Sequence, residues 1–142
     1  MTRVSELSVE ADLGNLKKVR SFISETGKSL GANDDSVGDM CLVVDEAVTN
    51  VILHGYDGRE GTVQVIVESE GDALVITIRD QAKAFNPDEV EAPHLEESLS
   101  ERDYGGMGVY LINKLTDEAE FRPLPGGGNE LRLVKNGVIT PL

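Results

Sequence analysis

Residues 40–52 have the sequence MCLVVDEAVTNVI, which combines an apolar stripe with two polar side chains. The apolar residues recur at spacings of three and four, which is typical of a helix with one face buried in a core. Glu46 and Asn50 stand four residues apart, so they project from the same side of that helix, at the edge of the stripe. Glu46 can accept a proton from a hydroxyl group, and Asn50 can offer Mg²⁺ a neutral oxygen ligand. Taken alone, such a pair more commonly belongs to an ordinary solvated helix edge.

The rest of the chain alternates short apolar runs with turn residues. A Ser36 N-cap and the stripe predict a helix that ends near Leu53, followed by a glycine-rich exit over residues 55–61. Gly71-Asp72 is typical of a hairpin turn between two strands. The other expected elements are a strand over Val4–Val9, a helix over Leu13–Leu30 capped by Asp12, strands over Thr62–Glu68 and Ala73–Arg79, a helix over the apolar run Val109–Leu115 that Gly105–Gly108 opens, and strands over Ala119–Arg122 and Glu130–Val134.

This order of elements predicts an α+β fold. Strands cluster instead of alternating with helices, which favours a two-layer sandwich of a mostly antiparallel sheet with helices on one face. We expect one domain over residues 1–142, because 142 residues suit a single core. Residues 80–104 contain Pro87 and Pro93 and show no sustained period, which is typical of a lid.

Composition narrows the class of protein. The formal net charge is -13 and no stripe of basic residues is visible, which argues against nucleic-acid binding. Cys41 is the single cysteine, so an intrachain disulfide is excluded and core packing is the expected role. No apolar run reaches the roughly 18 residues of a membrane span, and the N-terminus lacks a secretory apolar region. We therefore expect a cytoplasmic protein with no membrane association.

Two further features could carry chemistry. Gly105-Gly106-Met107-Gly108 precedes an apolar run at a predicted helix start, where backbone amides can approach a phosphate, although glycines also simply end loops. Asp80 follows a predicted strand and could accept a hydrogen bond from the exocyclic amine of a base, or could be a turn residue. No Cys or His lies at metal-ligand spacing from His54 or His94, and no nucleophile-elbow sequence appears.

Taken together and in this order, the motifs resemble those of a known family. Glu46-Ala47-Val48-Thr49-Asn50 followed by His54-Gly55-Tyr56 resembles the N box of bacterial anti-sigma-factor serine kinases, members of the GHKL superfamily of gyrase, histidine-kinase and heat-shock-chaperone ATPases. Asp80 falls at the position of the family's adenine-reading Asp, and Gly105–Val109 resembles its second glycine box. The resemblance covers essentially the whole chain and implies the Bergerat ATP-binding fold.

The resemblance also implies roles for individual residues. Glu46 would be the general base that takes the proton of a partner's serine hydroxyl, and Asn50 would hold Mg²⁺. Asp80 would bind the adenine amino group, and Arg102 would face the γ-phosphate from the lid. The remaining nucleotide-binding positions implied by the family motifs are Ala82, Phe85, Gly105, Gly106, Met107, Gly108 and Asn129.

The sequence departs from the family pattern at two of these positions. Ala82 replaces the glycine that usually follows the Asp by two residues, and Asn129 replaces the usual Thr. A positive φ at Ala82 would cost about 1–2 kcal/mol, which would weaken nucleotide binding. Phe85-Asn86-Pro87 still matches the family's exit from this box.

The function implied is an ATP-dependent protein-serine kinase and anti-sigma-factor-like partner switch. Its cofactors would be ATP and Mg²⁺, its substrate a serine of a STAS-type antagonist, and its second partner a sigma factor; the resemblance also allows a homodimer. The alternative is a binding module of the same fold that does little or no chemistry, marked by Ala82 and Asn129. A two-component histidine kinase fits less well, because the chain shows no dimerisation helices or phospho-accepting His segment.

Overall fold

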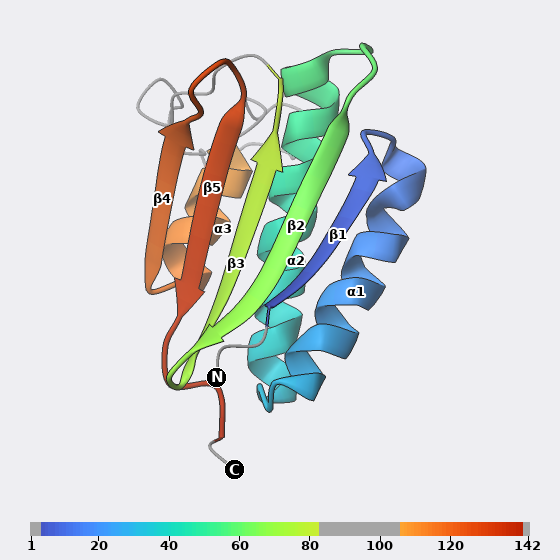
Figure 1. The fold of residues 1–142 in the computed structure, drawn as a ribbon. Coiled ribbons are helices and arrows are strands. Elements are labelled where there is room, and N and C mark those ends of the chain that lie inside the picture. Colours follow the sequence, from blue (N-terminus) through green and yellow to red (C-terminus); the bar gives the residue numbers. More distant parts are fainter. Residues whose placement is uncertain (1–3, 83–105, 141–142) are drawn as a thin grey trace.

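The computed structural model describes residues 4–82 and 106–140 of the chain, and side chains from residue 110 onward in the second range. Five strands form one sheet in the order β1-β2-β3-β5-β4 (Figure 1). Every neighbouring pair is antiparallel. The strands are β1 (Val4–Glu10), β2 (Thr62–Glu70), β3 (Ala73–Asp80), β4 (Glu118–Pro123) and β5 (Asn129–Lys135).

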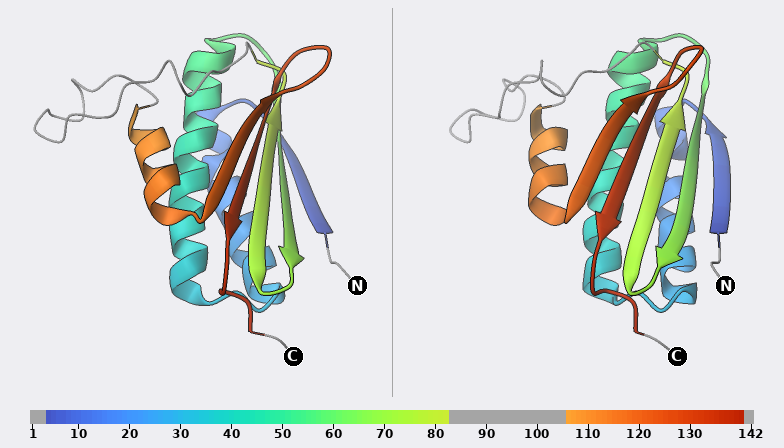
Figure 2. Two further views of the ribbon diagram at one scale, coloured as in Figure 1. Left: turned by 90° about the vertical axis from the view of Figure 1, so that its left-hand side faces the viewer. Right: turned by 60° about the vertical axis from the view of Figure 1, so that its left-hand side comes forward.

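The helices cover one face of this sheet and leave the other face open (Figure 2). They are the 3₁₀ turn η1 (Leu13–Asn15), α1 (Leu16–Ser29), α2 (Asp34–Asn50), the π-helical turn η2 (Val51–Tyr56) and α3 (Gly106–Leu115). In Figure 1, α2 lies behind the middle of the sheet, with α1 behind β1 and α3 behind β4 and β5. The predicted two-layer α+β arrangement is therefore confirmed.

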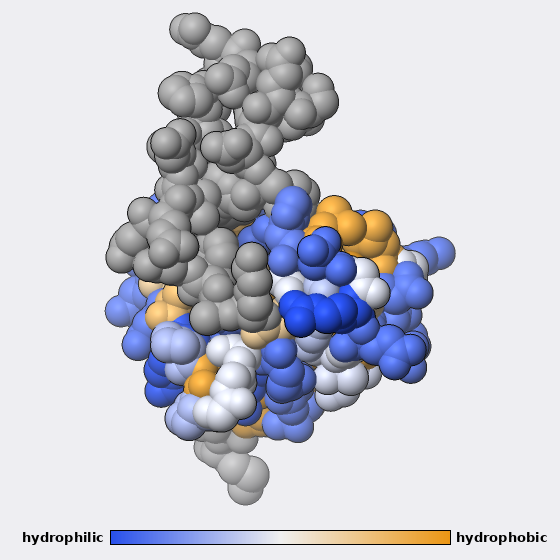
Figure 3. Space-filling view, turned by 90° about the horizontal axis from the view of Figure 1, so that it is seen from above, coloured by the Kyte–Doolittle hydropathy of each residue, from blue (hydrophilic) through white to orange (hydrophobic). Residues whose placement is uncertain are grey.

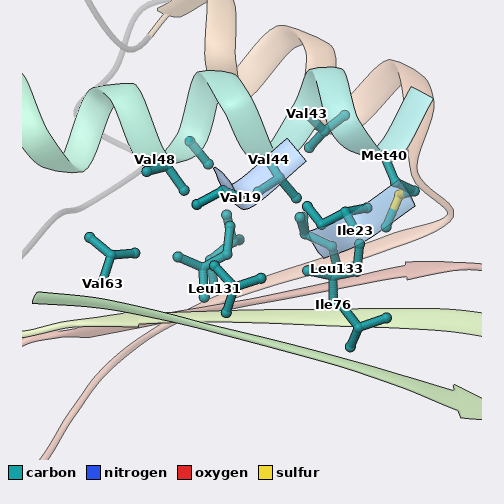
Figure 4. Close-up of a cluster of buried hydrophobic side chains, with 14 of the residues drawn as sticks. Val19, Ile23, Met40, Val43, Val44, Val48, Val63, Ile76, Leu131 and Leu133 are labelled. Atoms are coloured by element: carbon teal, nitrogen blue, oxygen red, sulfur yellow. The ribbon is translucent and has the colours of Figure 1, made fainter. Parts of the chain in front are cut away.

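The core lies between α2 and the central strands. On β3, Leu74, Ile76 and Ile78 alternate toward the helices and are at most 2% exposed, because this strand is paired on both sides. Figure 4 shows side chains from α1, α2 and the sheet meeting in this layer. Fully buried members from the helices are Val19, Ile23, Met40, Val43, Val44 and Val48. The apolar stripe of residues 40–52 is thus the helix face that packs on the sheet.

The open face of the sheet carries ion pairs beside a small apolar cluster of Ala73, Val75 and Val134. Glu130 on β5 is 7% exposed and receives Arg79 from β3 and Arg122 from β4, each at 2.8 Å. These cross-strand pairs join three neighbouring strands on the solvent side. The two faces of β5 therefore differ, with Glu130 outward and Leu131 and Leu133 inward.

Helix α2 begins earlier than the sequence predicted. The N-cap is Asn33, whose side-chain oxygen accepts a hydrogen bond from the Ser36 backbone amide at 2.8 Å. Ser36 is therefore the donor in the cap and not the capping residue, and its side chain is buried. Asp34 and Asp35 fill the first turn, where negative charge is favourable. Asp12 caps as predicted, although its helix opens with the η1 turn.

The far end of this helix also differs from the prediction. After Asn50 the chain continues as the π-helical turn η2, which ends at Tyr56 before the left-handed Asp57 (φ 51°). Gly55, expected in a glycine-rich exit, lies inside this turn. A side chain at this position would clash, because a Cβ on Gly55 would lie 2.8 Å from the Cβ of Ala82. Glycine therefore allows the helix end to touch the segment that follows β3.

The predicted hairpins are present, with Gly71 at positive φ (61°) between β2 and β3. The predicted lid beyond residue 82 lies outside the described residues. Among the helices of the described ranges, none is long and apolar enough to span a membrane.

The capping assignment predicts different costs for two substitutions. Asn33→Ala should lower the free energy of unfolding by about 1 kcal/mol, because the Ser36 amide loses its partner. Ser36→Ala should change it by less than about 0.5 kcal/mol. Urea denaturation of both variants measures the difference. A larger loss in Ser36→Ala than in Asn33→Ala would contradict the assignment.

Candidate functional site

Asp80 ends the central strand β3 on the side that faces the helices. It continues the inward alternation of Ile76 and Ile78, and it is 2% exposed. Its Oδ1 accepts hydrogen bonds from the Ala82 backbone amide (2.8 Å) and from Asn129 Nδ2 (2.9 Å). Within the described ranges, Oδ2 accepts no hydrogen bond. The carboxylate is therefore held through one oxygen and presents the other.

Burial raises the pKa of the Asp80 carboxyl, while the hydrogen bonds from Asn129 and from the Ala82 amide act in the opposite direction. An acceptor buried without a partner is costly, so this oxygen is suited to a ligand that donates a hydrogen bond. The ligand that the sequence predicted for Asp80, the exocyclic amine of a base, is a donor of this kind.

The β4–β5 hairpin closes over Asp80. Gly128 has a φ of 100°, and a Cβ on it would lie 2.1 Å from the Asp80 carbonyl oxygen. Only glycine allows this approach, which puts Asn129 opposite Asp80 in the β3–β5 register. The strand pairing of Asn129 with Asp80 was the missing signal, and sequence alone does not supply that register.

Ala82 is accommodated without backbone strain. Among the described residues other than glycine, Asp57 is the one with positive φ, so the predicted cost of a left-handed Ala82 does not arise. The Ala82 side chain is 5% exposed and faces Gly55, which has no Cβ to oppose it. Asn129 likewise has a defined function here as a donor to Asp80.

Glu46 and Asn50 lie one turn apart on α2, and both are half-buried, whereas Val43 and Ala47 beside them are buried. Burial raises the pKa of Glu46, and the neighbouring charge of Asp45 raises it further. Asp45 itself pairs with Arg20 on α1 at 3.1 Å. Glu46 is therefore a carboxylate of increased basicity at the edge of the core.

The three features converge at one end of the molecule. β3 ends there with Asp80, α2 ends there with Asn50, and α3 begins there at Gly106 (Figure 2). α2 and α3 pack against each other. The first backbone amides of α3 have no partner within the helix itself, and they lie at the positive end of the helix dipole, which favours an anion.

Other predicted positions fall as follows. Gly106, Met107 and Gly108 form the first turn of α3, and their backbone alone is described. Phe85, Arg102 and Gly105 lie outside the described residues. No group of three or more His, Cys, Asp or Glu in residues 4–82 and 106–140 could hold a metal ion. Asn50, at the end of α2, has a side-chain oxygen of the type that Mg²⁺ accepts as a ligand.

A hollow of about 400 Å³ adjoins this end of the sheet, between the exit of η2 and the β4–β5 hairpin. It is lined by Tyr56, Arg59, Glu60, Gln81, Ala82, Pro123, Leu124, Gly127 and Gly128. Figure 3 looks onto this end, where the described surface is mostly hydrophilic with smaller hydrophobic areas. The sequence predicted no role in the site for Tyr56 or Gly55, yet both lie against the segment after Asp80.

Comparison with known proteins finds a family and individual relatives that match most of this chain. Residues 9–135 match the family described as the histidine kinase-like ATPase domain. The anti-sigma F factor of Bacillus subtilis (strain 168) is 31% identical over 119 residues, which cover 83% of this chain and 79% of that protein. The anti-sigma F factor of Thermoanaerobacter sp. (strain X514) is 27% identical over 134 residues, covering 94% of both chains.

A solved structure shares the fold. The crystal structure of the RsbU and RsbW domains of Rv1364c from Mycobacterium tuberculosis matches with a TM-score of 0.65 and 18% identity. The match covers 98% of this chain and 33% of that chain, so this chain spans about a third of that protein's length. At this identity the likeness bears on the fold alone.

The family match covers most of the chain and implies that it binds ATP. The two relatives named above, which match most of the chain, are both anti-sigma F factors. The chain therefore belongs to the anti-sigma-factor serine kinase family, within the histidine kinase-like ATPases of the GHKL superfamily.

Proposed function

We propose that this chain is a protein-serine kinase that transfers the γ-phosphoryl group of Mg-ATP to a serine of a STAS-type antagonist, and that it binds a sigma factor in alternation with that antagonist. The observation that carries the proposal is the buried Asp80 carboxylate, fixed at Oδ1 and open at Oδ2 within the described ranges. The names of the relatives, anti-sigma F factors, support the choice of partners.

Asp80 would select the base. An ionised carboxylate oxygen accepts but does not donate, so Oδ2 matches the 6-amino group of adenine and opposes the 6-carbonyl oxygen of guanine. Asn129 and the Ala82 amide support this by holding Oδ1, which fixes the orientation of the carboxylate. Adenine recognition therefore rests on three described residues from β3, β5 and the segment between β3 and α3.

The phosphates would lie toward α3 and α2. Gly106 and Gly108 are in the first turn of α3, where backbone amides attract an anion. The Asn50 side-chain oxygen would hold Mg²⁺, which supplies charge neutralisation at the phosphoryl group when bound. Gly105 and Met107 would complete this turn, Phe85 would flank the base, and Arg102 would reach the γ-phosphate from the lid, all by the family motif.

Glu46 would act as the general base. It accepts the proton of the serine hydroxyl as the serine oxygen bonds to the γ-phosphorus, and the bond from that phosphorus to the β-phosphate oxygen breaks to release ADP. The raised pKa of Glu46, caused by burial and by the charge of Asp45, makes it a better proton acceptor than an exposed glutamate. Product phosphoserine brings about -1.5 to -2 charges to a protein of formal net charge -13, which favours release.

The alternative of an inactive binding module rested on Ala82 and Asn129. Ala82 has ordinary backbone geometry against Gly55, and Asn129 supports Asp80. Neither departure removes a group that the proposed chemistry needs. The kinase is therefore favoured over the inactive module.

Removing the base should abolish phosphotransfer but not nucleotide binding. Glu46→Gln keeps size and polarity, so Mg-ATP affinity should stay within about threefold while the transfer rate falls at least about a hundredfold. The assay is transfer of labelled γ-phosphate to a STAS-type antagonist. Glu25→Gln, an exposed change on α1, is the matched control. Equal transfer rates for Glu46→Gln and the control would reject the base assignment.

The charge of Asp45 should set the pH profile of the reaction. Burial is the main cause of the raised Glu46 pKa and Asp45 the second, so Asp45→Asn should lower that pKa. The carboxylate then stays ionised at lower pH, and the acid limb of kcat/KM for phosphotransfer should move toward lower pH.

The control for this profile is Asp34→Asn, in the first turn of α2. It lies roughly 18 Å along the helix from Glu46 by helical rise, beyond the screening length at physiological salt. Its profile should match that of the wild type. A shift of the Asp45→Asn limb toward higher pH would contradict the proposed titration of Glu46.

A further inference from the structure

Tyr56 ends the helix that carries Glu46 and Asn50. Its side chain is 4% exposed, and its hydroxyl makes two hydrogen bonds with backbone groups. It donates to the Thr62 carbonyl oxygen at 2.6 Å, at the start of β2. It accepts from the Gln81 amide at 2.9 Å, directly after β3. One hydroxyl thus joins the helix end to two strands.

The tyrosine ring is fixed by close packing. A Cβ on Gly61 would lie 2.1 Å from the ring atom Cε1 and 2.3 Å from Cζ, so the ring lies against bare backbone. The π-helical turn η2 brings Tyr56 to this position, and the left-handed Asp57 then turns the chain away. The hydroxyl therefore has little freedom to leave Gln81.

The Gln81 amide lies one residue beyond Asp80. The next amide, that of Ala82, donates to Asp80 Oδ1. Two successive backbone amides therefore donate hydrogen bonds, that of Gln81 to the Tyr56 hydroxyl and that of Ala82 to the Asp80 carboxylate. The contact between Ala82 and Gly55 presses the same short segment against the helix end. The path of this segment decides where Oδ2 points.

We propose that Tyr56 is a positioning residue for base recognition: its hydroxyl holds the Gln81 amide and thereby aims the Asp80 carboxylate at the exocyclic amine of the nucleotide. This rests on the proposed adenine-reading role of Asp80. It also links the base site to the helix of Glu46 and Asn50, because Tyr56 belongs to the continuation of that helix.

The test is the discrimination between two nucleotides. ATP has the 6-amino group, whereas purine riboside 5′-triphosphate lacks it and is otherwise the same. Tyr56→Phe keeps the ring and removes the hydroxyl. Its ATP affinity should fall roughly tenfold, and its affinity for the analogue should change less than about twofold. In an Asp80→Asn background, Tyr56→Phe should cause no further loss of ATP affinity, because the two residues act as a unit.

The control is Thr26→Val, which deletes a half-buried hydroxyl that donates to the Phe22 carbonyl on α1 at 2.6 Å. Its ratio of ATP to analogue affinity should equal that of the wild type. A merely structural role of Tyr56 would lower both affinities alike and leave the ratio unchanged, which would overturn the inference. A wild type that does not prefer ATP over the analogue would overturn the adenine-reading role of Asp80 as well, so the two failures are distinguishable.

Amide hydrogen exchange on the wild type gives a second measurement that needs no variant. The Gln81 amide should exchange at least about tenfold more slowly than an unprotected amide, because the Tyr56 hydroxyl holds it. Exchange at the unprotected rate would overturn the inference even if Tyr56→Phe did not fold.

Discussion

A buried carboxylate at the end of the central strand is the constraint on which the rest of the site depends. Leaving Asp80 charged and 2% exposed is costly unless its oxygens find donors. The β3–β5 register supplies one donor by placing Asn129 opposite Asp80. Gly128 allows the backbone of the β4–β5 hairpin to approach the backbone of Asp80 closely. The turn after β3 adds the Ala82 amide. Among the described residues none donates to the other oxygen, so the arrangement that holds the carboxylate is also the one in which we propose that a ligand binds.

Helix α2 connects this position to the chemistry. Its apolar face packs on the sheet and fixes its height over β3, while Glu46 and Asn50 stand at the edge of that face. Beyond Asn50 the π-helical turn carries Gly55 and Tyr56 to the segment after Asp80. The proposed catalytic residues and the residues that contact the segment after Asp80 therefore belong to one continuous helix.

The sequence was sufficient for features that depend on local pattern. Alternation of Val63, Val65 and Val67 and the turn at Gly71 predicted the first hairpin, and spacing along α2 predicted its buried face. The α+β layers followed from the order of these elements. The cap of α2 was missed because Asn33 and Ser36 are both good capping residues, and only the backbone conformation selects between them.

The site was harder to predict because its decisive contacts join residues distant in sequence. Asn129 was expected to weaken the site because it replaces a Thr, yet its amide reaches Asp80 across the sheet, which requires the register. Ala82 raised the same concern, and the compensating residue, Gly55, lies on a different element. Conversely, the helix alone did not establish a role for Glu46 and Asn50, and the functional interpretation depended on the additional motifs at Asp80 and Gly106.

The most direct measurement of the central claim is a calorimetric titration of Mg-ATP into the wild type and Asp80→Asn. The account predicts that the amide, which cannot offer two carboxylate oxygens, weakens binding at least about a hundredfold, whereas equal affinities would contradict it.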